Sequence, residues 1–305
     1  MSRILLTGRN GQLGFELQRR LARLGRVFAP DRAQLDLADA DSIRRTLREI
    51  KPKLIVNAAA YTAVDQAESE PEAAFAINGL AAGVLAEEAK HLGAVLIHYS
   101  TDYVFDGSKA GPYTEEDLPR PLSTYGRSKF AGERAIRAVD GPHLILRASW
   151  IYSARGKNFL LTILRLAQER AELSVVDDQV GAPTWSRAIA LATGSMLQHL
   201  GYGQAGFRDA CTDKRGIYHL SAAGQTSWHG FAKAILANAS GARFAGTAFA
   251  LARVPALKAI TTEQYPTPAQ RPRNSLLSNA KLQNAFGLAM PGWESSLADC
   301  MSSAL

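Results

Sequence analysis

A seven-residue stretch decides the fold of this chain: Gly8-Arg9-Asn10-Gly11-Gln12-Leu13-Gly14. Its spacing is GxxGxxG, and it stands between a short apolar run, Ile4 to Leu6, and a segment whose leucines recur every three or four residues. Glycine permits a tight turn, lets the backbone approach a pyrophosphate and allows close helix–strand packing. The N-terminus of the helix that follows offers N–H donors and positive potential to phosphates. The stretch therefore predicts a dinucleotide-binding loop, and the alternative is a purely structural turn.

Outward from this loop, apolar runs of strand length alternate with amphipathic segments of helical length. The expected strands are Arg3–Leu6, Val27–Ala29, Leu54–Ala58, Ala94–Tyr99 and His143–Arg147. The expected helices lie near residues 12–24, 40–50, 71–92 and 123–138. Such alternation is typical of parallel strands joined by right-handed helical crossovers. The first half therefore predicts an α/β fold with a doubly wound parallel sheet, the Rossmann arrangement.

The second half has a looser pattern, with helices expected near residues 157–170, 185–200 and 227–238. Neither an internal repeat nor an obvious linker separates it from the first half. We expect a dinucleotide-binding domain over residues 1–148 and a smaller C-terminal α/β domain, mainly for substrate binding, over residues 149–305. Some segments of the second part are expected to return to the first.

Composition and charge exclude several classes of protein. The 305 residues are 47% hydrophobic and carry a net charge of +7, which is ordinary for a globular chain and rules out a disordered or collagen-like one. Ten basic and five acidic residues lie within positions 208–305, where they are scattered rather than clustered. We expect them to form a solvated surface or to attract a small anionic substrate. No nucleic-acid partner is needed to explain them.

The sequence also gives no sign of export or membrane insertion. The three apolar residues from Ile4 to Leu6 are too few for the core of a signal peptide. The longest uncharged stretch, residues 188–207, contains glycines and polar residues and is typical of a buried helix and loop. Cys211 and Cys300 stand 89 positions apart, so they form neither a metal-ligand motif nor a disulfide framework. We expect a cytoplasmic protein with no membrane contact and no metal site.

A candidate catalytic pair lies on the helix expected near residues 123–138. Tyr125 and Lys129 form a YxxxK motif, and side chains four residues apart share one face of a helix. A free tyrosine has a pKa near 10, and a nearby ammonium group is expected to lower it by stabilising tyrosinate. The alternative is an ordinary pair of surface residues, since YxxxK by itself is common.

The context of this motif favours chemistry. Ser100-Thr101-Asp102 follows an apolar strand, so the Thr101 hydroxyl is expected at the carboxyl edge of the sheet, where open α/β folds bind ligands. The glycine loop, the hydroxyl at the strand end and the YxxxK pair occur in the order and spacing of the extended short-chain dehydrogenase/reductases. The chain resembles that superfamily.

Further stretches resemble one family within it, the dTDP-4-dehydrorhamnose reductases. These stretches are Val56–Asp65, Glu68–Pro71, His98–Phe105, Arg147–Tyr152, Asn158–Phe159, Asp178–Thr184 and Tyr265–Ser275. Together with the glycine loop they extend over nearly the whole chain.

The resemblance implies an NAD(P)H-dependent oxidoreductase that reduces the C4 keto group of dTDP-4-dehydro-L-rhamnose to give dTDP-L-rhamnose. Tyr125 would donate the proton, Lys129 would tune Tyr125 and bind the ribose, and Thr101 would hydrogen-bond the C4 oxygen. Asp102 and Trp150 would contact the sugar nucleotide; the alternatives are a helix cap and a core aromatic. The residues expected to line the cofactor, NADPH or NADH, are Gly8, Gly11, Gln12, Leu13, Gly14, Asp31, Asp36, Leu37, Ala60, Tyr61, Thr62, Tyr99, Tyr125 and Lys129.

Charged residues in two parts of the chain bear on the choice of ligands. Asp31 closes the second strand, where a carboxylate binds the ribose 2′-hydroxyl of NADH, yet Arg9 and Arg32 are placed to hold a 2′-phosphate. We therefore expect use of both cofactors. Arg271 and Arg273 stand in a proline-rich loop, and their forked donors suit a diphosphate; the alternative is a rigid turn.

The chain departs from the family at one position. Some members form magnesium-bridged dimers through clustered glutamates, and Glu16 matches one such position, but Arg187 stands where another glutamate is expected. Because an arginine repels a divalent cation, we doubt a magnesium bridge and expect either a monomer or a homodimer. Two alternatives to the reductase stay open: another sugar-nucleotide reductase or epimerase, and a non-catalytic NADP-binding subunit resembling the regulatory subunit of methionine adenosyltransferase.

Overall fold

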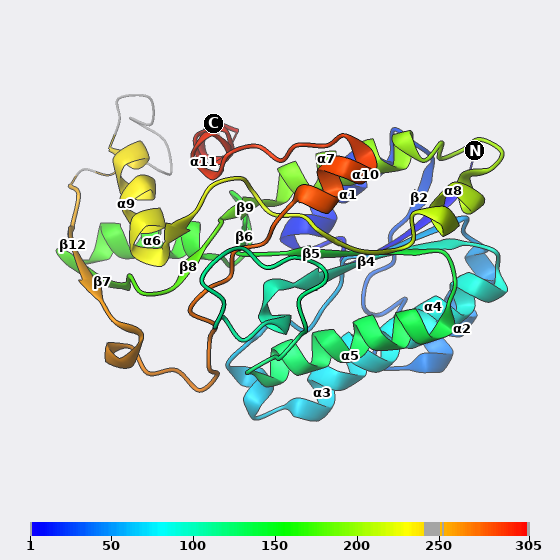
Figure 1. The fold of residues 1–305 in the computed structure, drawn as a ribbon, viewed down its shortest axis with the longest axis horizontal. Helices are drawn as coiled ribbons and strands as arrows, with labels where there is room; N and C mark the ends of the chain where they lie inside the picture. The colour runs from blue at the N-terminus through cyan, green and yellow to red at the C-terminus, as the bar shows by residue number, and fades with distance from the viewer. Residues whose placement is uncertain (1, 241–250, 252, 304–305) are drawn as a thin grey trace.

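The computed structural model describes residues 2–240, 251 and 253–303. A parallel sheet with strand order β10-β5-β4-β3-β1-β2 forms its centre (Figure 1). Its strands are β1 (Arg3–Thr7), β2 (Arg26–Phe28), β3 (Leu54–Asn57), β4 (Val95–Thr101), β5 (His143–Ala148) and β10 (Gly216–His219). The predicted doubly wound parallel sheet is confirmed, and β10 is a strand that the sequence did not predict.

Helices cover both faces of this sheet (Figure 1). On one face α1 (Gln12–Leu21) packs against α7 (Ser186–His199), and on the other α4 (Ala81–His91) packs between α2 (Ala40–Ile50) and α5 (Thr124–Val139). The pattern of β1 shows why both faces are needed. Alternate side chains of a strand point to opposite faces, and in β1 all are buried beyond Arg3. Ile4 and Leu6 join the core beneath α1, whereas Leu5 joins the core beneath α2 and α4.

One predicted helix is interrupted. In place of a single helix near residues 71–92, the chain forms α3 (Pro71–Phe75), a π-helical turn (Ala76–Leu80) and α4. The side chain of Asn78, inside the π-helical turn, binds both backbone groups of Tyr61. Such turns often occur at functional sites, and this one fixes a loop of the site described below.

The C-terminal half forms a smaller layer beside the sheet, at the left of Figure 1. There β7 (Glu172–Val176) pairs in parallel with β12 (Ala256–Ile260), and α6 (Phe159–Glu169) packs against α9 (Trp228–Ala239). The remaining elements are β6 (Ile151–Tyr152), β8 (Val180–Gly181), β9 (Thr184–Trp185), α8 (Phe207–Asp213), β11 (Thr226–Ser227), α10 (Ala280–Phe286), α11 (Trp293–Ser302) and the 3₁₀ turns Gln66–Glu68, Asp102–Val104 and Thr262–Gln264.

Parts of the C-terminal half pack with the N-terminal half. Strand β10 hydrogen-bonds to β5 and α7 packs on α1, so two of its segments lie with the N-terminal layer. The division near residue 148 stays a prediction.

The strand order locates the site. The chain adds β2 on one side of β1 and then β3, β4 and β5 on the other side, so the order of the strands reverses between the neighbours β1 and β3. Ligands of open α/β sheets bind outside the carboxyl ends of the strands at such a reversal. The segments that begin there are the glycine loop after Thr7 and residues 58–62 after Asn57.

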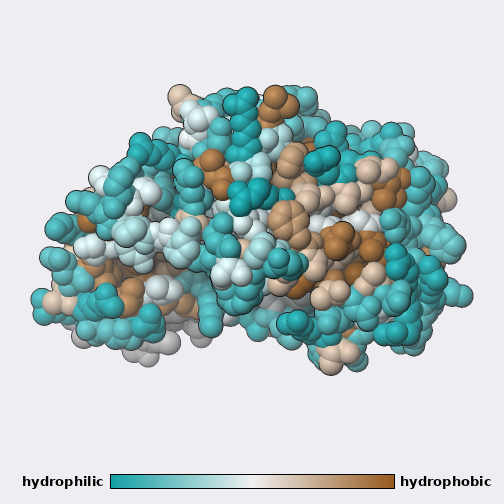
Figure 2. Space-filling view, turned by 90° about the horizontal axis from the view of Figure 1, so that it is seen from below, coloured by the Kyte–Doolittle hydropathy of each residue, from teal (hydrophilic) through white to brown (hydrophobic). Residues whose placement is uncertain are grey.

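The face of the molecule that carries α3 and α5 is mostly polar (Figure 2). Seen from the side of α3 and α5, it is largely hydrophilic, with hydrophobic residues gathered in the right half of the view (Figure 2). The exposed large hydrophobic side chains of this layer include Phe75 and Leu80. Among the described residues, every helix is too short or too polar to cross a membrane.

Candidate active site

A cavity of about 630 Å³ opens at the carboxyl ends of the strands. The glycine loop, residues 58–64, the end of β4, the start of α5 and the segment after β5 all contribute to its walls. Its lining residues are Gly8, Asn10, Gly11, Gln12, Leu13, Ala58, Ala59, Ala60, Thr62, Val64, Tyr99, Ser100, Thr101, Asp102, Tyr103, Tyr125, Lys129, Ala148, Trp150, Ile151, Gly156, Lys157 and Trp228. The structure thus brings the predicted catalytic residues and most of the predicted cofactor residues together.

The glycine loop has the shape that a phosphate group requires. Gly8 adopts φ +74°, and a Cβ there would lie 2.8 Å from the backbone of Ala58, so only glycine fits. A Cβ on Gly14 would collide with the carbonyl group of Gly8. Helix α1 begins after Gly11 with neither a capping side chain nor an acidic residue in its first turn. Its first N–H groups therefore remain available to an anion, and the residues present fit a dinucleotide.

A smaller cavity of about 270 Å³ lies on the other side of the glycine loop, between it and the end of β2. The predicted residues Asp31, Asp36 and Leu37 line it, together with Arg9 and Arg32. The Oδ2 atom of Asp31 accepts a hydrogen bond from Arg9 at 3.2 Å, while Oδ1 accepts from the backbone N–H of Ala33 and of Gln34. Asp31 is therefore both a turn residue and a carboxylate facing the ligand space.

Helix α5 presents Tyr125 to the cavity. The hydroxyl of Ser123 caps this helix by accepting from the N–H of Gly126 at 3.1 Å, which fixes its first turn. The Tyr125 ring meets that of Tyr103 edge-on, with 5.7 Å between centroids. Burial raises the pKa of Tyr125 to about 12, although a hydrogen bond with Thr101 opposes the shift. The expectation of a lowered pKa was wrong, because burial disfavours the tyrosinate and Nζ of Lys129 contacts the carbonyl of Tyr99 instead of the phenol.

Lys129 is buried, with 2% of its surface exposed. Its Nζ donates to the backbone carbonyl of Tyr99 at 2.6 Å and lies 3.3 Å from Nε2 of His98. Burial lowers the pKa of Lys129 to about 8, and the charge of Glu133 one turn along α5 opposes this. A lysine with this pKa changes its charge close to the neutral range.

Glu133 is itself held in place by a buried ion pair. The guanidinium of Arg147 binds it through two hydrogen bonds, at 2.8 and 2.6 Å, and the hydroxyl of Ser100 donates to it at 2.6 Å. Both charged side chains are only 1% exposed. Because β4, β5 and α5 each supply one partner, this cluster fixes the catalytic helix against the sheet.

At the end of β4, Thr101 and Asp102 carry polar atoms into the cavity. The Thr101 hydroxyl donates to Oδ1 of Asp102 at 3.1 Å and accepts from the N–H of Tyr103 at 3.1 Å. Burial raises the pKa of the Asp102 carboxyl to about 6, although hydrogen bonds with Ser275 and Thr101 oppose the shift. Its Oδ2 atom is buried in the wall of the cavity, so Asp102 is suited to bind a ligand hydroxyl.

The loop after β3 is held by the interrupted helix. Asn78 accepts from the N–H of Tyr61 at 2.9 Å and donates to its carbonyl at 3.0 Å, and it also donates to Ser128 on α5. The hydroxyl of Tyr61 donates to Glu70. Ala60 and Thr62 line the main cavity, so this clamp positions a wall of the site that the sequence predicted.

Trp150 lies across the cavity with an unusual backbone. Its φ is +47°, a conformation that costs free energy for residues other than glycine and that occurs at functional sites. Its indole stacks on that of Trp228, with 3.6 Å between centroids and 8° between planes. The Nε1 of Trp228 donates to Gln179 at 3.2 Å.

Sequence reasoning missed several lining residues. They are Asn10, Ala58, Ala59, Val64, Ser100, Tyr103, Ala148, Ile151, Gly156, Lys157 and Trp228. Most lie beside predicted residues in the chain, so proximity to a motif was a usable signal. Trp228 is different: it begins α9, far along the sequence, and no motif marks it.

The two predicted arginines occupy different surroundings. Arg271 binds Asp65 through two hydrogen bonds, at 3.0 and 2.7 Å, and lines a third cavity of about 340 Å³ that shares Trp228 with the main one. Arg273 is about two-thirds exposed and pairs with Glu263. The structure places Arg271 next to the site and Arg273 on the surface beside it.

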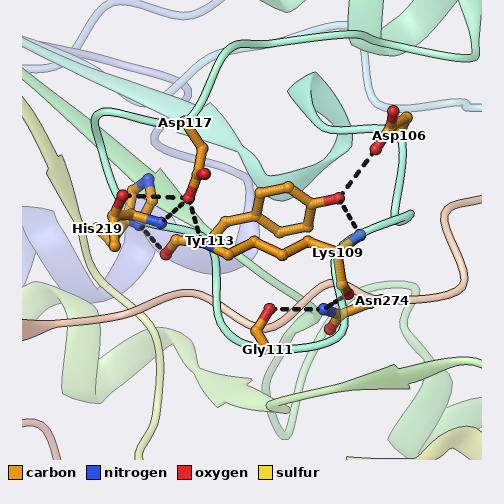
Figure 3. A network of polar contacts seen from close by, with 8 residues as sticks. Asp106, Lys109, Gly111, Tyr113, Asp117, His219 and Asn274 are labelled. Carbon is orange, nitrogen blue, oxygen red and sulfur yellow. Dashed lines mark hydrogen bonds and ion pairs between the residues drawn. The ribbon is translucent and has the colours of Figure 1, made fainter.

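The loop that carries both arginines is anchored by Asn274. Its side-chain amide donates to the carbonyl groups of Lys109 and Gly111, at 2.7 and 2.9 Å (Figure 3). In the same network the Tyr113 hydroxyl donates to Asp106 at 2.9 Å. The segment after β4 and the segment before α10 are therefore held together at the edge of the site.

Glu16 and Arg187, the two positions on which the doubt about a magnesium bridge rests, form an ion pair. Arg187 donates to Glu16 with Nε 3.1 Å from Oε2. Within residues 2–240, 251 and 253–303, no group of three or more His, Cys, Asp or Glu side chains is placed to hold a metal ion. The side chains present do not fit a bridging cation.

Comparisons with known proteins agree with this geometry. A sequence model of the family described as "RmlD substrate binding domain" matches residues 1–305. The chain is 47% identical over 299 residues to a dTDP-4-dehydrorhamnose reductase from Burkholderia thailandensis, covering 98% of each chain. It is 44% identical to one from Escherichia coli, covering 95% of this chain and 94% of the relative.

Solved structures show the same fold. A dTDP-4-dehydrorhamnose reductase from Bacillus anthracis, crystallised with NADP, superposes with a TM-score of 0.86 at 34% identity, covering 99% of both chains. A UDP-glucose 4-epimerase from Thermus thermophilus superposes with a TM-score of 0.73 at 19% identity, a likeness that extends to the fold alone.

Proposed function

The chain belongs to the RmlD family of dTDP-4-dehydrorhamnose reductases, and from this membership we propose how its own residues carry out the reaction. It is an NAD(P)H-dependent oxidoreductase that reduces the C4 keto group of dTDP-4-dehydrorhamnose to an alcohol. The observation that carries the mechanism is the convergence of Thr101, Tyr125 and Lys129 on one cavity beside the glycine loop.

The cofactor is held by the two loops at the strand reversal. The free N–H groups at the start of α1 bind its diphosphate, and Asp31, Asp36 and Leu37 line the space for the adenosine half. Arg9 now pairs with Asp31; by turning away from it toward a 2′-phosphate, Arg9 lets the site accept NADPH as well as NADH. When bound, the reduced nicotinamide supplies the hydride that the reaction needs.

Tyr125 supplies the proton. Its raised pKa keeps the phenol protonated across the neutral range, which is the form a proton donor must have at the start of a reduction. As the carbonyl carbon accepts hydride, the oxygen becomes an alkoxide and takes the phenolic proton. Thr101 donates a hydrogen bond to the same oxygen. Lys129, whose Nζ contacts the carbonyl of Tyr99 and His98 rather than the phenol, would bind the ribose of the nicotinamide.

The sugar is oriented by Asp102 and Trp150. The buried Oδ2 of Asp102 accepts from a sugar hydroxyl, and the indole of Trp150, which lines the cavity, contacts the sugar. Arg271, which lines the adjoining cavity, is placed to meet the diphosphate of the sugar nucleotide. Arg273 serves the same anion from the surface by attraction at longer range.

We propose the cytoplasm as its compartment. Cys211 and Cys300 are buried free thiols, a state that reducing compartments maintain. Its oligomeric state, monomer or homodimer, stays a prediction.

The deciding experiment follows NAD(P)H absorbance with enzymatically generated dTDP-4-dehydro-L-rhamnose. We expect one equivalent of either cofactor to be oxidised per sugar nucleotide, with dTDP-L-rhamnose as the product by NMR. An epimerase would convert the sugar without net loss of NAD(P)H, and a regulatory subunit would leave both unchanged. Either of those results would remove the reductase assignment.

A further inference from the structure

A row of polar side chains crosses the sheet beneath the cavity, where the strands are otherwise apolar. Thr7 of β1, Asn57 of β3 and His98 of β4 stand at facing register positions, and each is at most 2% exposed. The Thr7 hydroxyl lies 2.7 Å from Oδ1 of Asn57, and Nδ2 of Asn57 lies 2.9 Å from Nδ1 of His98. The three side chains form one continuous hydrogen-bonded chain.

Each end of this chain meets part of the proposed active site. At one end Nε2 of His98 lies 3.3 Å from Nζ of Lys129. At the other end the Thr7 oxygen accepts from the N–H of Ala59 at 3.1 Å. Ala59 lines both cofactor cavities, and Gly8 follows Thr7 directly. The chain therefore connects the catalytic lysine to the two loops that hold the cofactor.

Resting on the proposed function, we propose that His98 is a positioning residue of the reduction. It fixes Nζ of Lys129 through Nε2, and it is itself fixed by Asn57 and Thr7 through Nδ1, which accepts from Nδ2 of Asn57. The Nε2–H then donates to Nζ in its uncharged form, while Nζ donates to the carbonyl of Tyr99. The reaction then depends on His98 through Lys129, because Nε2 is directed to Lys129 and the ring is buried. An apolar side chain at this position would leave both Asn57 and Lys129 with unmade hydrogen bonds, which is costly for buried groups.

The charges around His98 suit this role. Burial and the neighbouring Lys129 hold the pKa of His98 well below its usual range, so the ring stays neutral and its single ring proton lies on Nε2, facing Nζ of Lys129. The other charged group facing Lys129 is Glu133, which Arg147 neutralises. Tyr125 lies on the same helix and stays protonated. His98 thus offers a partner without adding a charge that would displace Lys129.

Two substitutions of His98 test the contacts of Nδ1 and Nε2 separately. In His98→Gln the amide reaches the place of Nε2 and keeps a partner for Lys129, whereas in His98→Asn it reaches only the place of Nδ1 and keeps the partner for Asn57. We measure the Kd for NADPH by fluorescence and kcat for the sugar nucleotide. We expect His98→Asn to weaken NADPH binding and to lower kcat about tenfold each, and His98→Gln to change both less than threefold.

A second background shows whether the effect passes through Lys129. His98→Asn and His98→Gln are each combined with Lys129→Met. The two double variants should have equal Kd values for NADPH, because the side-chain nitrogen of Lys129 is absent from both. Equal effects of the two substitutions in the natural background, or the same tenfold loss with Lys129→Met, would overturn the proposal. Since Kd does not require turnover, a wild-type protein that binds NADPH without reducing the sugar would refute the proposed function and still leave His98 tested.

A measurement on the unaltered fold covers the case in which His98→Asn does not fold. The ¹⁵N resonances of the His98 ring are followed from pH 6 to 10 and assigned by their loss in His98→Gln. We expect the Nε2 resonance to shift with a midpoint near 8, the pKa of Lys129, and the shift to vanish in Lys129→Met. An Nε2 resonance that does not respond to this titration would refute the contact.

Discussion

At the scale of single residues, the catalytic pair shows how one helix turn creates two different environments. Tyr125 and Lys129 are four positions apart on α5 and line one cavity, yet burial raises the pKa of the first to about 12 and lowers that of the second to about 8. Burial disfavours the charged form of each group. The phenol is therefore protonated across the neutral range, which is the form that the proposed proton donor needs.

Tyr125→Phe tests this acid directly. We expect kcat to fall by about 10²- to 10⁴-fold, the usual value of a positioned proton donor, while the Kd for NADPH changes little because the ring remains. Stopped-flow absorbance and fluorescence titration measure the two quantities. Tyr218→Phe is the matched control, since its hydroxyl donates to the carbonyl of Lys214 away from the cavity. Undiminished turnover in Tyr125→Phe would remove Tyr125 from the mechanism.

Asp102 carries a stability cost that depends on pH. Its pKa is about 6 in the folded protein, above its ordinary value of 3.8, so the folded state holds a proton that the unfolded state releases. The contribution of Asp102 to the free energy of unfolding is therefore most favourable below pH 4. It decreases as the pH rises from 4 through 6. Asp102→Asn should raise the free energy of unfolding at pH 7 by up to about 3 kcal/mol, with little gain at pH 4.

Urea unfolding at both pH values measures this effect. Asp213→Asn, an exposed carboxylate without a resolved partner, is the control and should change stability little at either pH. The same Asp102→Asn protein should bind the sugar nucleotide more weakly, because an amide replaces the carboxylate acceptor. A loss of stability at pH 7 would show that Asp102 stabilises the fold.

Individual residues were predictable to different degrees. Thr101, Tyr125 and Lys129 stand at a strand end and on a helix face that periodicity locates, so their convergence follows from the fold. The role proposed for His98 was not predictable, because no spacing rule reveals that Asn57 and Thr7 face it across two strands. Its contacts depend on strand register, which the sequence of one strand does not contain.

At the scale of elements, the three glycines of the loop have unequal roles. Gly14 lies where a Cβ would collide with the carbonyl of Gly8, whereas a Cβ on Gly11 would lie 3.3 Å from the same oxygen. We expect Gly14→Ala to lower the free energy of unfolding by about 2 kcal/mol or more, as overpacking does, and to abolish NADPH binding. Gly11→Ala should cost clearly less stability. Thermal unfolding with and without NADPH compares the pair, and equal losses would contradict the packing argument.

Most elements of the sheet were predictable because they are strongly periodic and fully buried. The strands β1, β3, β4 and β5 lie within one or two residues of their expected bounds. Strand β10 was missed since Gly216–His219 is short and flanked by polar residues, and only its pairing with β5 makes it a strand. The break of the helix near Asn78 arises from its bonds to Tyr61, which are tertiary contacts.

At the scale of the whole molecule, an ion pair joins the cofactor layer to the C-terminal layer. Asp65 follows β3, and Arg271 lies in the loop anchored by Asn274. The hydrogen bond from Arg271 is the main reason that the pKa of Asp65 is lowered. In the proposed binding of the sugar nucleotide, its diphosphate would replace Asp65 as the anionic partner of Arg271.

We expect Arg271→Ala to raise KM for the sugar nucleotide at least tenfold while the Kd for NADPH stays within about threefold. Arg273→Ala should raise KM by a smaller factor than Arg271→Ala does. This factor should be larger at low ionic strength, because salt screens the exposed charge of Arg273. Steady-state kinetics at two salt concentrations distinguish them. Should both substitutions leave KM unchanged, the diphosphate lies elsewhere.

The relation between the two layers is what the sequence revealed least. Charge counting located a basic excess after residue 207, but Arg271 is matched by Asp65, more than 200 positions earlier. Trp228 likewise joins the cavity wall from a helix that no motif marks. Both depend on how separate segments pack, and packing between distant segments leaves no periodic trace in either one.

The stacked indoles of Trp150 and Trp228 give the protein a built-in optical signal. Two indoles with 3.6 Å between their centroids are close enough for their electronic transitions to couple, so we expect the pair to contribute a coupled band to the ultraviolet circular dichroism spectrum. Both rings line the main cavity, and a ligand that shifts either one changes that coupling. Occupancy of the sugar site can thus be followed without a label, and the coupled band is lost when either tryptophan is replaced by leucine.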